Sequence, residues 1–245
     1  MNLALVGYGR MGKTVERVAQ EGGHRIAAIY TDVEPVRADR VPADVEVFID
    51  FSLPEAVPAT VREVARSGRP IVVGTTGWYE KLPEIREIVQ EAGIGLLYSP
   101  NFALGVHLFF RLVEWAARLY SRLGIYDCCI QEIHHAGKAD SPSGTALRLA
   151  EIVRSHWGGK SELLFDRPSG RIASHQLHVT SARCGFFPGE HSLVIDSPED
   201  TIELRHRTRS REVFARGALR AAEWIRDRKG VFTAEDMLTD LLGQS

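Results

Sequence analysis

Cysteine is scarce in this chain, with three residues among 245. Cys128 and Cys129 are neighbours on a predicted strand, so their side chains point to opposite faces, and Cys184 lies far along the sequence. Three cysteines do not make a disulfide framework, and these have no paired metal-ligand spacing. We expect all three to be packing residues, and we expect no metal site.

Net charge and long apolar runs are also nearly absent. A formal net charge of -2 excludes a general electrostatic attraction to nucleic acid or to an anionic membrane. The longest apolar run, HLFFRLVEWAARL, is interrupted by charges and falls short of the roughly 18 residues that a membrane helix needs. The start, MNLALVGYG, carries no basic leader, so a cytoplasmic location is expected.

The first hundred residues alternate apolar runs with helical patterns. Helices are predicted near residues 11–20, 55–67 and 84–92, where apolar side chains recur at helical spacing. Between them lie the predicted strands LALVGYG, IAAIY, VEVFIDFS, IVVGTTG and GLLYSPN. Continuous apolar strands separated by helices predict a parallel sheet that is covered on both faces.

The pattern changes after Asn101. A long helix (104–123), the strand YDCCIQEIHH and a helix ending near Trp157 are followed by three strand-like runs between Arg171 and Arg207. In TIELRHR, apolar and charged side chains alternate, as in an antiparallel sheet with one covered face. The chain ends in helical patterns at 212–226 and 234–242, whose packing partner the periodicity does not decide. The predicted fold class is α/β, a nucleotide-binding half followed by a mixed half.

A glycine-rich turn joins the first predicted strand to the first helix. Gly7, Gly9 and Gly12 form the pattern G-x-G-x-x-G, which allows a tight turn, close approach of a pyrophosphate and close helix–strand packing. The strand and helix on either side are the context that this motif requires, so it predicts a dinucleotide site.

The acidic residue that would contact the adenosine ribose is Asp32, twenty positions after Gly12, with Thr31 as an equal alternative. Arg10 and Lys13 flank the glycine turn and are placed to accept a ribose phosphate. The choice between NADH and NADPH therefore stays open.

Two further strand ends carry small polar residues. GTTG begins at Gly74, and SPNF runs from Ser99 to Phe102. Ligands bind at the carboxyl ends of the strands in a doubly wound sheet, so both segments are candidates for the nicotinamide side of the site.

The segment EIHHAGKADSPSGTALRLAE, from Glu132, gathers cationic and proton-donating groups before a helix. His134 and His135 end a strand, and histidine titrates near neutral pH, while Lys138 adds a fixed cation. Ser143 is a candidate N-cap, and the free amides of Gly144 and Thr145 suit a carboxylate. The segment predicts a site for a small acid with one or two carboxylates.

Two other interpretations of this segment remain. Adjacent histidines on a strand cannot readily chelate one ion, and no carboxylate stands at ligand spacing, which argues against a metal. A solvated basic loop is the simpler alternative. Arg183 and His191, around the segment CGFFPGEH, are further candidates for binding an acid, although spacing alone does not decide it.

The stretch EIHHAGKADSPSGTA resembles the signature E-x-H-H-x-x-K-x-D-x-P-S-G-T-A of the bacterial dihydrodipicolinate reductases of lysine biosynthesis. The resemblance extends in order through VGYGRMG, DFSLPEAV, VVGTTGW, SPNFALGV, GEHSLVID and ELRHRTRSREVFARGAL, and so covers essentially the whole chain. It implies reduction of a cyclic dicarboxylate by NADH or NADPH, with loss of water.

The resemblance also implies roles for individual residues. By its position in the motif, His134 resembles the family's general acid/base, and Lys138 resembles a second proton donor. His135 would contact a substrate carboxylate. Ser143, Gly144 and Thr145 would hold the other carboxylate. The cofactor would be bound by Gly7, Tyr8, Gly9, Arg10, Met11, Gly12, Asp32, Gly74, Thr75, Thr76, Ser99, Pro100, Asn101 and Phe102.

At the level of the fold, the resemblance implies a Rossmann-like domain of residues 1–101 and 209–245. Residues 102–208 would form an α+β domain with a mixed sheet that binds substrate and makes a homotetramer. The chain departs from the family in a shorter glycine turn, in Ala103 and His107, and in Phe186. Another nicotinamide dehydrogenase of a small amino or keto acid, or a non-catalytic cofactor sensor, is the alternative.

Overall fold

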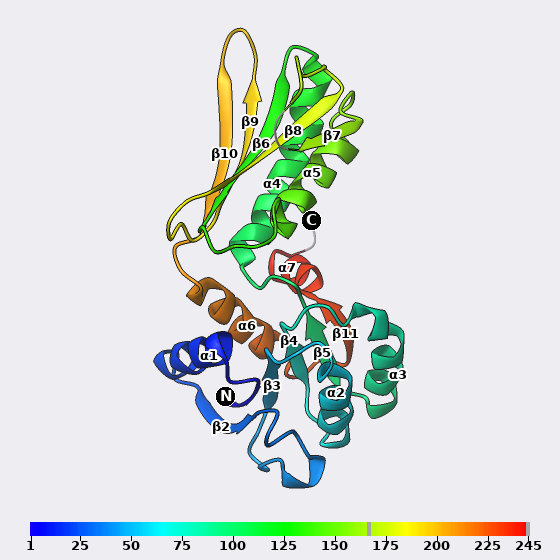
Figure 1. Ribbon diagram of the computed structural model, residues 1–245. Coiled ribbons are helices and arrows are strands. Elements are labelled where there is room, and N and C mark those ends of the chain that lie inside the picture. The colour runs from blue at the N-terminus through cyan, green and yellow to red at the C-terminus, as the bar shows by residue number, and fades with distance from the viewer. Residues whose placement is uncertain (166–167, 244–245) are drawn as a thin grey trace. The chain divides into compact units, whose positions relative to one another are not determined.

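The computed structural model describes residues 1–165 and 168–243, and it divides into two compact units. Unit 1 comprises Met1–Leu104 and Arg211–Ser245, and unit 2 comprises Gly105–Ser210. The C-terminal helical segment, whose packing the periodicity left open, therefore belongs with the first hundred residues. Each unit has its own sheet and its own core (Figure 1).

Unit 1 is built on a six-stranded parallel sheet in the order β11-β5-β4-β3-β1-β2. Its strands are β1 (Asn2–Val6), β2 (Arg25–Tyr30), β3 (Val47–Asp50), β4 (Ile71–Val73), β5 (Gly95–Tyr98) and β11 (Gly230–Thr233). Its helices are α1 (Arg10–Glu21), α2 (Val57–Arg66), α3 (Leu82–Ala92), α6 (Glu212–Ile225) and α7 (Ala234–Leu241), with the short 3-10 turns η1 (Ala38–Arg40) and η2 (Tyr79–Lys81). The strand order reverses at β1, and a doubly wound sheet binds its ligand at such a reversal.

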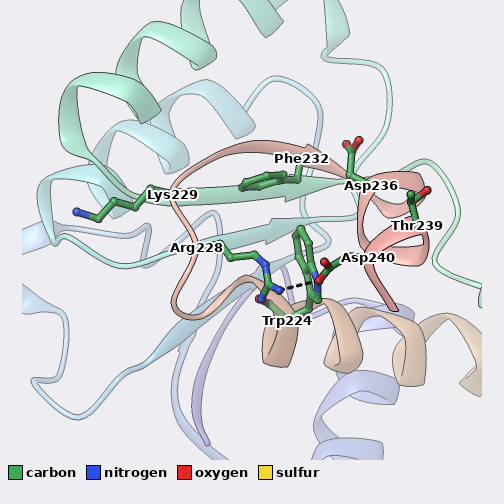
Figure 2. Close-up of a pocket in the computed structure, with 7 residues that line it drawn as sticks. All are labelled: Trp224, Arg228, Lys229, Phe232, Asp236, Thr239 and Asp240. Carbon is green, nitrogen blue, oxygen red and sulfur yellow. Dashed lines mark hydrogen bonds and ion pairs between the residues drawn. The ribbon is translucent and has the colours of Figure 1, made fainter. Parts of the chain in front are cut away.

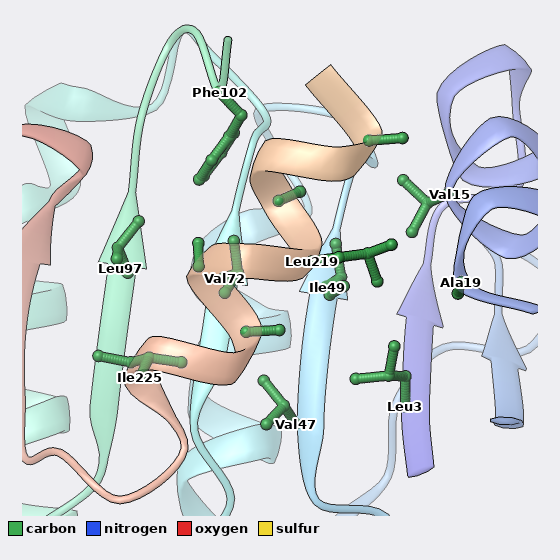
Figure 3. Packing of buried hydrophobic residues seen from close by; sticks show 14 of the residues in the cluster. Leu3, Val15, Ala19, Val47, Ile49, Val72, Leu97, Phe102, Leu219 and Ile225 are labelled. Atoms are coloured by element: carbon green, nitrogen blue, oxygen red, sulfur yellow. The ribbon is translucent and has the colours of Figure 1, made fainter. Parts of the chain in front are cut away.

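Alternation along each strand fills two cores, one on each face of this sheet. Leu3 and Leu5 of β1 pack in one cluster, while Ala4 and Val6 pack in the other. Helix α6 covers the first face, where Leu219 and Ile225 lie against the strands (Figure 3). Because both faces are covered, the strands are apolar throughout, as the sequence predicted.

Unit 2 has a five-stranded mixed sheet in the order β10-β9-β6-β8-β7. Its elements are α4 (Leu104–Tyr120, with Leu104 in unit 1), the 3-10 turn η3 (Ser121–Leu123), β6 (Asp127–His134), α5 (Gly144–His156), β7 (Glu162–Phe165), β8 (Gln176–Arg183), β9 (Glu190–Asp196) and β10 (Thr201–Arg207). Strands β6, β8 and β7 run parallel, and β9 is antiparallel to both β6 and β10. The predicted fold class, a Rossmann-like parallel sheet with a second mixed-sheet part, is confirmed.

One face of the second sheet carries the core of unit 2. Ile130, Val179 and Leu193 of three neighbouring strands pack with residues of α4 and α5. In β10 the predicted alternation is confirmed, because the apolar positions are half-buried and the charged ones are exposed. Residues on the covered face of β6 therefore pack in the same core as the first turn of α5.

The structure corrects the sequence expectations at two strands and at one cysteine. Strands β7 and β11 were not predicted; β11 has only two apolar residues, Val231 and Phe232, and lies between two helical patterns. Cys184 is exposed and is not a packing residue. Among the described residues, no helix combines the length and apolar character needed to cross a membrane.

A close approach between α6 and the loop after β5 fixes how the C-terminal segment packs in unit 1. A side-chain carbon at Gly217 would lie 1.7 Å from the Phe102 carbonyl oxygen. Only glycine fits there unless the backbone shifts. Phe102 itself is buried, with its ring 6.3 Å from that of Phe51.

We expect Gly217→Ala to lower the free energy of unfolding by about 1–3 kcal/mol, because overpacking outweighs the better helix propensity of alanine. Urea unfolding measures this change. Gly158→Ala is the control, since no atom lies within 4 Å of the added carbon. Equal or greater stability of Gly217→Ala would contradict the packing described.

Candidate active site

The three glycines of the turn after β1 differ in how much room each leaves for a side chain. Gly7 has a φ of 84°, and a side chain there would meet the Phe51 carbonyl oxygen at 2.5 Å. One at Gly12 would lie 2.2 Å from the Gly7 carbonyl oxygen. Gly9 has no atom within 4 Å of an added carbon. The turn therefore leaves its backbone open at Gly9, where a pyrophosphate can approach.

Asp50 at the end of β3 ties two strand ends together beside that turn. Its Oδ1 accepts hydrogen bonds from the Ser52 amide at 2.8 Å, the Ser52 hydroxyl at 2.7 Å and the Thr75 hydroxyl at 2.8 Å. Burial raises the pKa of Asp50 and outweighs these bonds. Sequence analysis did not single out this aspartate. Its position inside a predicted strand concealed a polar role that fixes Thr75.

The other predicted cofactor residues differ in exposure. Arg10, Asp32, Thr76 and Pro100 are exposed, whereas Tyr8, Met11 and Thr31 are partly buried. Ser99 is buried, and its hydroxyl donates to the Asn101 carbonyl at 2.6 Å. The Phe102 side chain belongs to the hydrophobic core of unit 1, so only its backbone is left to meet a ligand.

In unit 2, the predicted helix start lies at the predicted position. Ser143 is the N-cap of α5, and its side chain accepts a hydrogen bond from the Ala146 amide at 3.1 Å. The Gly144 and Thr145 amides make no hydrogen bond to any residue that the structure describes. Ser143 is buried, Gly144 is exposed and Thr145 is half-buried. Two amides at a positive helix end are thus open to an anion.

Strand pairing brings a buried carboxylate to this helix start. Glu132 and His134 lie two residues apart on the covered face of β6, and His191 of β9 is the cross-strand partner of Glu132. Glu132 Oε2 lies 3.2 Å from His134 Nδ1 and 3.3 Å from His191 Nε2. Glu132 Oε1 accepts from the Ser143 amide at 2.9 Å, and Ser143 Oγ shares a hydrogen bond of 3.0 Å with His191 Nε2.

Arg183 connects this cluster to the loop that carries Lys138. Its guanidinium donates to Glu132 Oε1 at 3.1 Å and to the Asp140 carbonyl at 2.6 Å. The Lys138 ammonium is 2.7 Å from Asp140 Oδ1, and the hydrogen bond from Lys138 lowers the pKa of Asp140. The Lys138 amide donates to the His135 carbonyl at 3.1 Å, and His135 is half-buried.

The charges in this cluster follow from burial and hydrogen bonding. Burial alone raises the pKa of Glu132, but the adjacent His134 and His191 side chains and the hydrogen bonding of Ser143 outweigh it and hold the pKa well below its usual range. Burial lowers the pKa of His191, although the nearby Glu132 carboxylate opposes the shift. The cluster thus holds an ionised carboxylate beside a neutral His191.

Glu132, His134 and His191 also present three donor atoms within 4.8 Å of one another, a set that zinc accepts. The sequence argument against a metal overlooked this cluster, because the third donor comes from a distant strand. A divalent ion here would lie in a buried site already neutralised by the Arg183 guanidinium, and His191 Nε2 already has Ser143 as a partner. We interpret the cluster as a hydrogen-bond network.

A shallow pocket elsewhere in unit 1 contains none of the predicted site residues (Figure 2). Trp224 and Phe232 pack edge to face, and Arg228 lies over Trp224 and donates to Asp240 at 2.7 Å. The charged groups of Arg228 and Asp240 thus satisfy each other, and this pocket has a structural role at the end of α6.

The lowered pKa values of the buried histidines predict how stability depends on pH. Burial lowers the pKa of both His191 and His206, so the unfolded chain binds more protons below its ordinary histidine pKa of about 6.5. Stability is therefore full above that value and is lost as pH falls below it. Glu132 adds a further loss only below the ordinary carboxyl pKa of about 4.3.

We expect the urea concentration at the unfolding midpoint to decrease when the pH is lowered from about 7.5 to about 5.5. In His191→Gln the difference between the two midpoints shrinks, because one buried titrating group is gone. His175→Gln is the control, since His175 is exposed and its removal leaves the difference unchanged. Equal pH dependence in all three proteins would contradict the burial of a neutral His191.

Known proteins match this chain along almost its whole length. A family model described as "Dihydrodipicolinate reductase, N-terminus" matches residues 1–102, and one described as "Dihydrodipicolinate reductase, C-terminus" matches residues 105–238. The 4-hydroxy-tetrahydrodipicolinate reductase of Christiangramia forsetii is 37% identical over 98% of this chain and 99% of its own length. That of Archaeoglobus fulgidus is 35% identical over 97% and 100%.

Solved structures support the same fold. A dipicolinate-bound dihydrodipicolinate reductase from Paenisporosarcina matches with a TM-score of 0.74 at 20% identity, over 95% of this chain and 97% of its own. A diaminopimelate dehydrogenase from C. glutamicum matches less well, with a TM-score of 0.55 at 16% identity, over 100% and 96%. From the family models and the two relatives, this chain belongs to the dihydrodipicolinate reductase family.

Proposed function

We propose that this enzyme reduces 4-hydroxy-tetrahydrodipicolinate to tetrahydrodipicolinate with loss of water, in the diaminopimelate route to lysine. The family match carries the reaction class, and relatives of that name align over nearly the whole chain. Neither another small-acid dehydrogenase nor a non-catalytic sensor is favoured by these relatives. The observation that carries the site is the buried Glu132 network beside the two open amides at the start of α5.

The substrate site is proposed to lie around that network. The Gly144 and Thr145 amides, with the Thr145 hydroxyl and the Ser143 cap, would bind one carboxylate, and His135 would bind the other. His134 would supply the proton, and Lys138 would be a second donor. A buried imidazole beside an ionised carboxylate and a nearby ammonium suit proton donation to a carbon that has gained a hydride.

The hydride donor is a nicotinamide nucleotide, which supplies two electrons and one proton equivalent when bound. The open backbone at Gly9 fits a pyrophosphate, and the α1 N-terminus favours its negative charge. Tyr8, Arg10, Met11, Thr76, Asn101 and the Phe102 backbone would complete the pocket, with Asp32 or Thr31 at the adenosine ribose. Both NADH and NADPH are proposed as substrates, because Arg10 and Lys13 stand near the same turn as Asp32.

Self-association and a cytoplasmic location stay predictions. Helix α4 and the turn after it expose a stripe of large apolar side chains, Leu108, Leu112, Trp115, Leu119 and Leu123. A stripe of this kind is typical of a surface that another chain covers, which supports a homo-oligomer such as the tetramer that the family resemblance implies.

The assay that tests this function couples the enzyme to the product of the preceding synthase and follows oxidation of NADH and NADPH side by side. We expect Lys138→Ala to lower kcat by about 100-fold, the loss typical of one well-placed charged donor. Lys81→Ala, which removes an exposed lysine of unit 1, is the control. Near-normal turnover in Lys138→Ala would exclude its role as proton donor, and inactivity of the parent enzyme would exclude the reaction.

A second prediction separates the glycines of the turn. Gly9→Ala should leave stability unchanged but raise the KM for the nucleotide by about tenfold or more, because a methyl group then stands where the pyrophosphate approaches. Gly12→Ala should instead destabilise the fold, since its added carbon meets the Gly7 carbonyl. Kinetics and urea unfolding of both variants measure this. An unchanged KM in a folded Gly9→Ala enzyme would place the nucleotide elsewhere.

A further inference from the structure

Glu132 occupies an unusual position for a carboxylate in unit 2. Its side chain has no exposed area, and it lies between β8 and β9 on the covered face of the sheet. A fully buried carboxylate is costly unless every lone pair is engaged. The two carboxylate oxygens of Glu132 differ in their hydrogen-bond partners, and this difference indicates what the side chain does in the site.

The Oε1 atom has two firm hydrogen-bond partners. The Ser143 amide donates from the start of α5, and the Arg183 guanidinium donates while also holding the Asp140 carbonyl. One oxygen thus connects the two open amides of α5 to the loop that carries Lys138. Both parts of the proposed substrate site are therefore fixed to the same buried atom.

The Oε2 atom faces His134 and His191 but forms no aligned hydrogen bond with either. His191 Nε2 already shares a hydrogen bond with Ser143. His134 Nδ1 is also buried, and no residue in the described part of the chain makes an aligned hydrogen bond to it. Glu132 Oε2 and His134 Nδ1 lie 3.2 Å apart, and each can satisfy the other if Nδ1 carries a proton that it donates to the carboxylate. Hydrogen bonds between catalytic groups often become aligned only when substrate is bound.

The other nitrogen of His134 is left accessible by a glycine. A side-chain carbon at Gly189 would lie 3.1 Å from His134 Nε2, and Gly189 has a φ of 135°. The Gly189 carbonyl is held by the Thr208 amide at 2.9 Å. The backbone here is fixed, and nothing larger than hydrogen stands against Nε2 from this residue.

We propose that Glu132 is the positioning residue of the active site, which holds the proton of His134 on Nδ1 so that Nε2 is the nitrogen presented to substrate. The same carboxylate fixes the α5 amides through Ser143. This inference rests on the proposed function. In this role Glu132 orients the acid/base His134 relative to the carboxylate site. An acidic residue orients a catalytic histidine in the same way in other enzymes.

Several charged or titratable groups face this pair from the surrounding elements. Lys138 and Asp140 lie in the loop after β6, Arg183 is on β8 and His191 is on β9, while His206 of β10 is the cross-strand partner of His191. Arg183 offsets the negative charge of Glu132, so removal of that charge leaves an uncompensated cation beside His134.

The test compares Glu132→Gln with the parent enzyme. Glutamine keeps a carbonyl oxygen for Ser143 and Arg183 but places an NH2 group opposite His134, where it cannot hold a proton on Nδ1. We expect kcat to fall by about 100-fold, the usual contribution of a positioned acid/base, with the KM for the nucleotide unchanged. The pH profile of kcat should also differ from that of the parent enzyme. Glu132→Asp, which keeps the charge, should recover part of the rate.

Glu190→Gln is the matched control. Glu190 is also buried, on the neighbouring strand, and is paired with Arg207, but it is not among the partners of either histidine. Glu190→Gln removes the carboxylate of an ion pair outside the proposed site, so kcat and the pH profile stay as in the parent enzyme. A fall in kcat in both glutamine variants, with the same pH profile, would reduce Glu132 to a structural role and overturn the proposal.

A spectroscopic measurement keeps the inference independent of turnover. Nitrogen-15 spectra of histidine-labelled parent enzyme, with and without dipicolinate as the probe, report which nitrogen of His134 carries the proton. We expect Nδ1–H in the parent enzyme and its loss in Glu132→Gln. Nε2–H in the parent enzyme would overturn the proposal even if no variant folds. If the parent enzyme does not turn over the substrate, the proposed function fails, and these spectra still decide the role of Glu132.

Discussion

The buried, ionised carboxylate of Glu132 is the constraint on which the rest of unit 2 depends. A charge without access to water survives only where hydrogen bonds and a counter-charge replace its hydration. The Ser143 amide and the Arg183 guanidinium supply these, and the two histidines lie within 3.2 and 3.3 Å of the other oxygen. Each partner comes from a different element, so satisfying one carboxylate fixes a helix start, three strands and a loop relative to one another.

In unit 1 the constraint is different, because a pyrophosphate must come close to the backbone of the glycine turn. Two glycines are required because other parts of the chain occupy the space of a side chain, and the third leaves the backbone open. Asp50 and Ser52 fix the neighbouring strand end, and α6 closes the opposite face of the sheet against Phe102. The glycine turn is therefore held from both sides before any ligand binds, which lowers the cost of binding.

Much of this fold could be predicted from local patterns. Continuous apolar strands, helical spacing and the strand–glycine–helix order are set by neighbours within about twenty positions, so they can be read along the chain. The Ser143 cap is local for the same reason. Strand β11 was not predicted because its two apolar residues lie between two helical patterns, and β7 was not predicted either. Asp50 was not singled out because it lies inside a predicted apolar strand.

The sequence by itself determined the two kinds of sheet, the nucleotide turn, the helix start and the histidine–lysine segment, because each depends on contacts between near neighbours. The tertiary structure alone decided that Glu132 meets His191 and Arg183, which lie 59 and 51 positions away, since strand register and not spacing brings them together. It also decided that the C-terminal helix packs on the first sheet, because periodicity marks a buried face but not the surface that buries it.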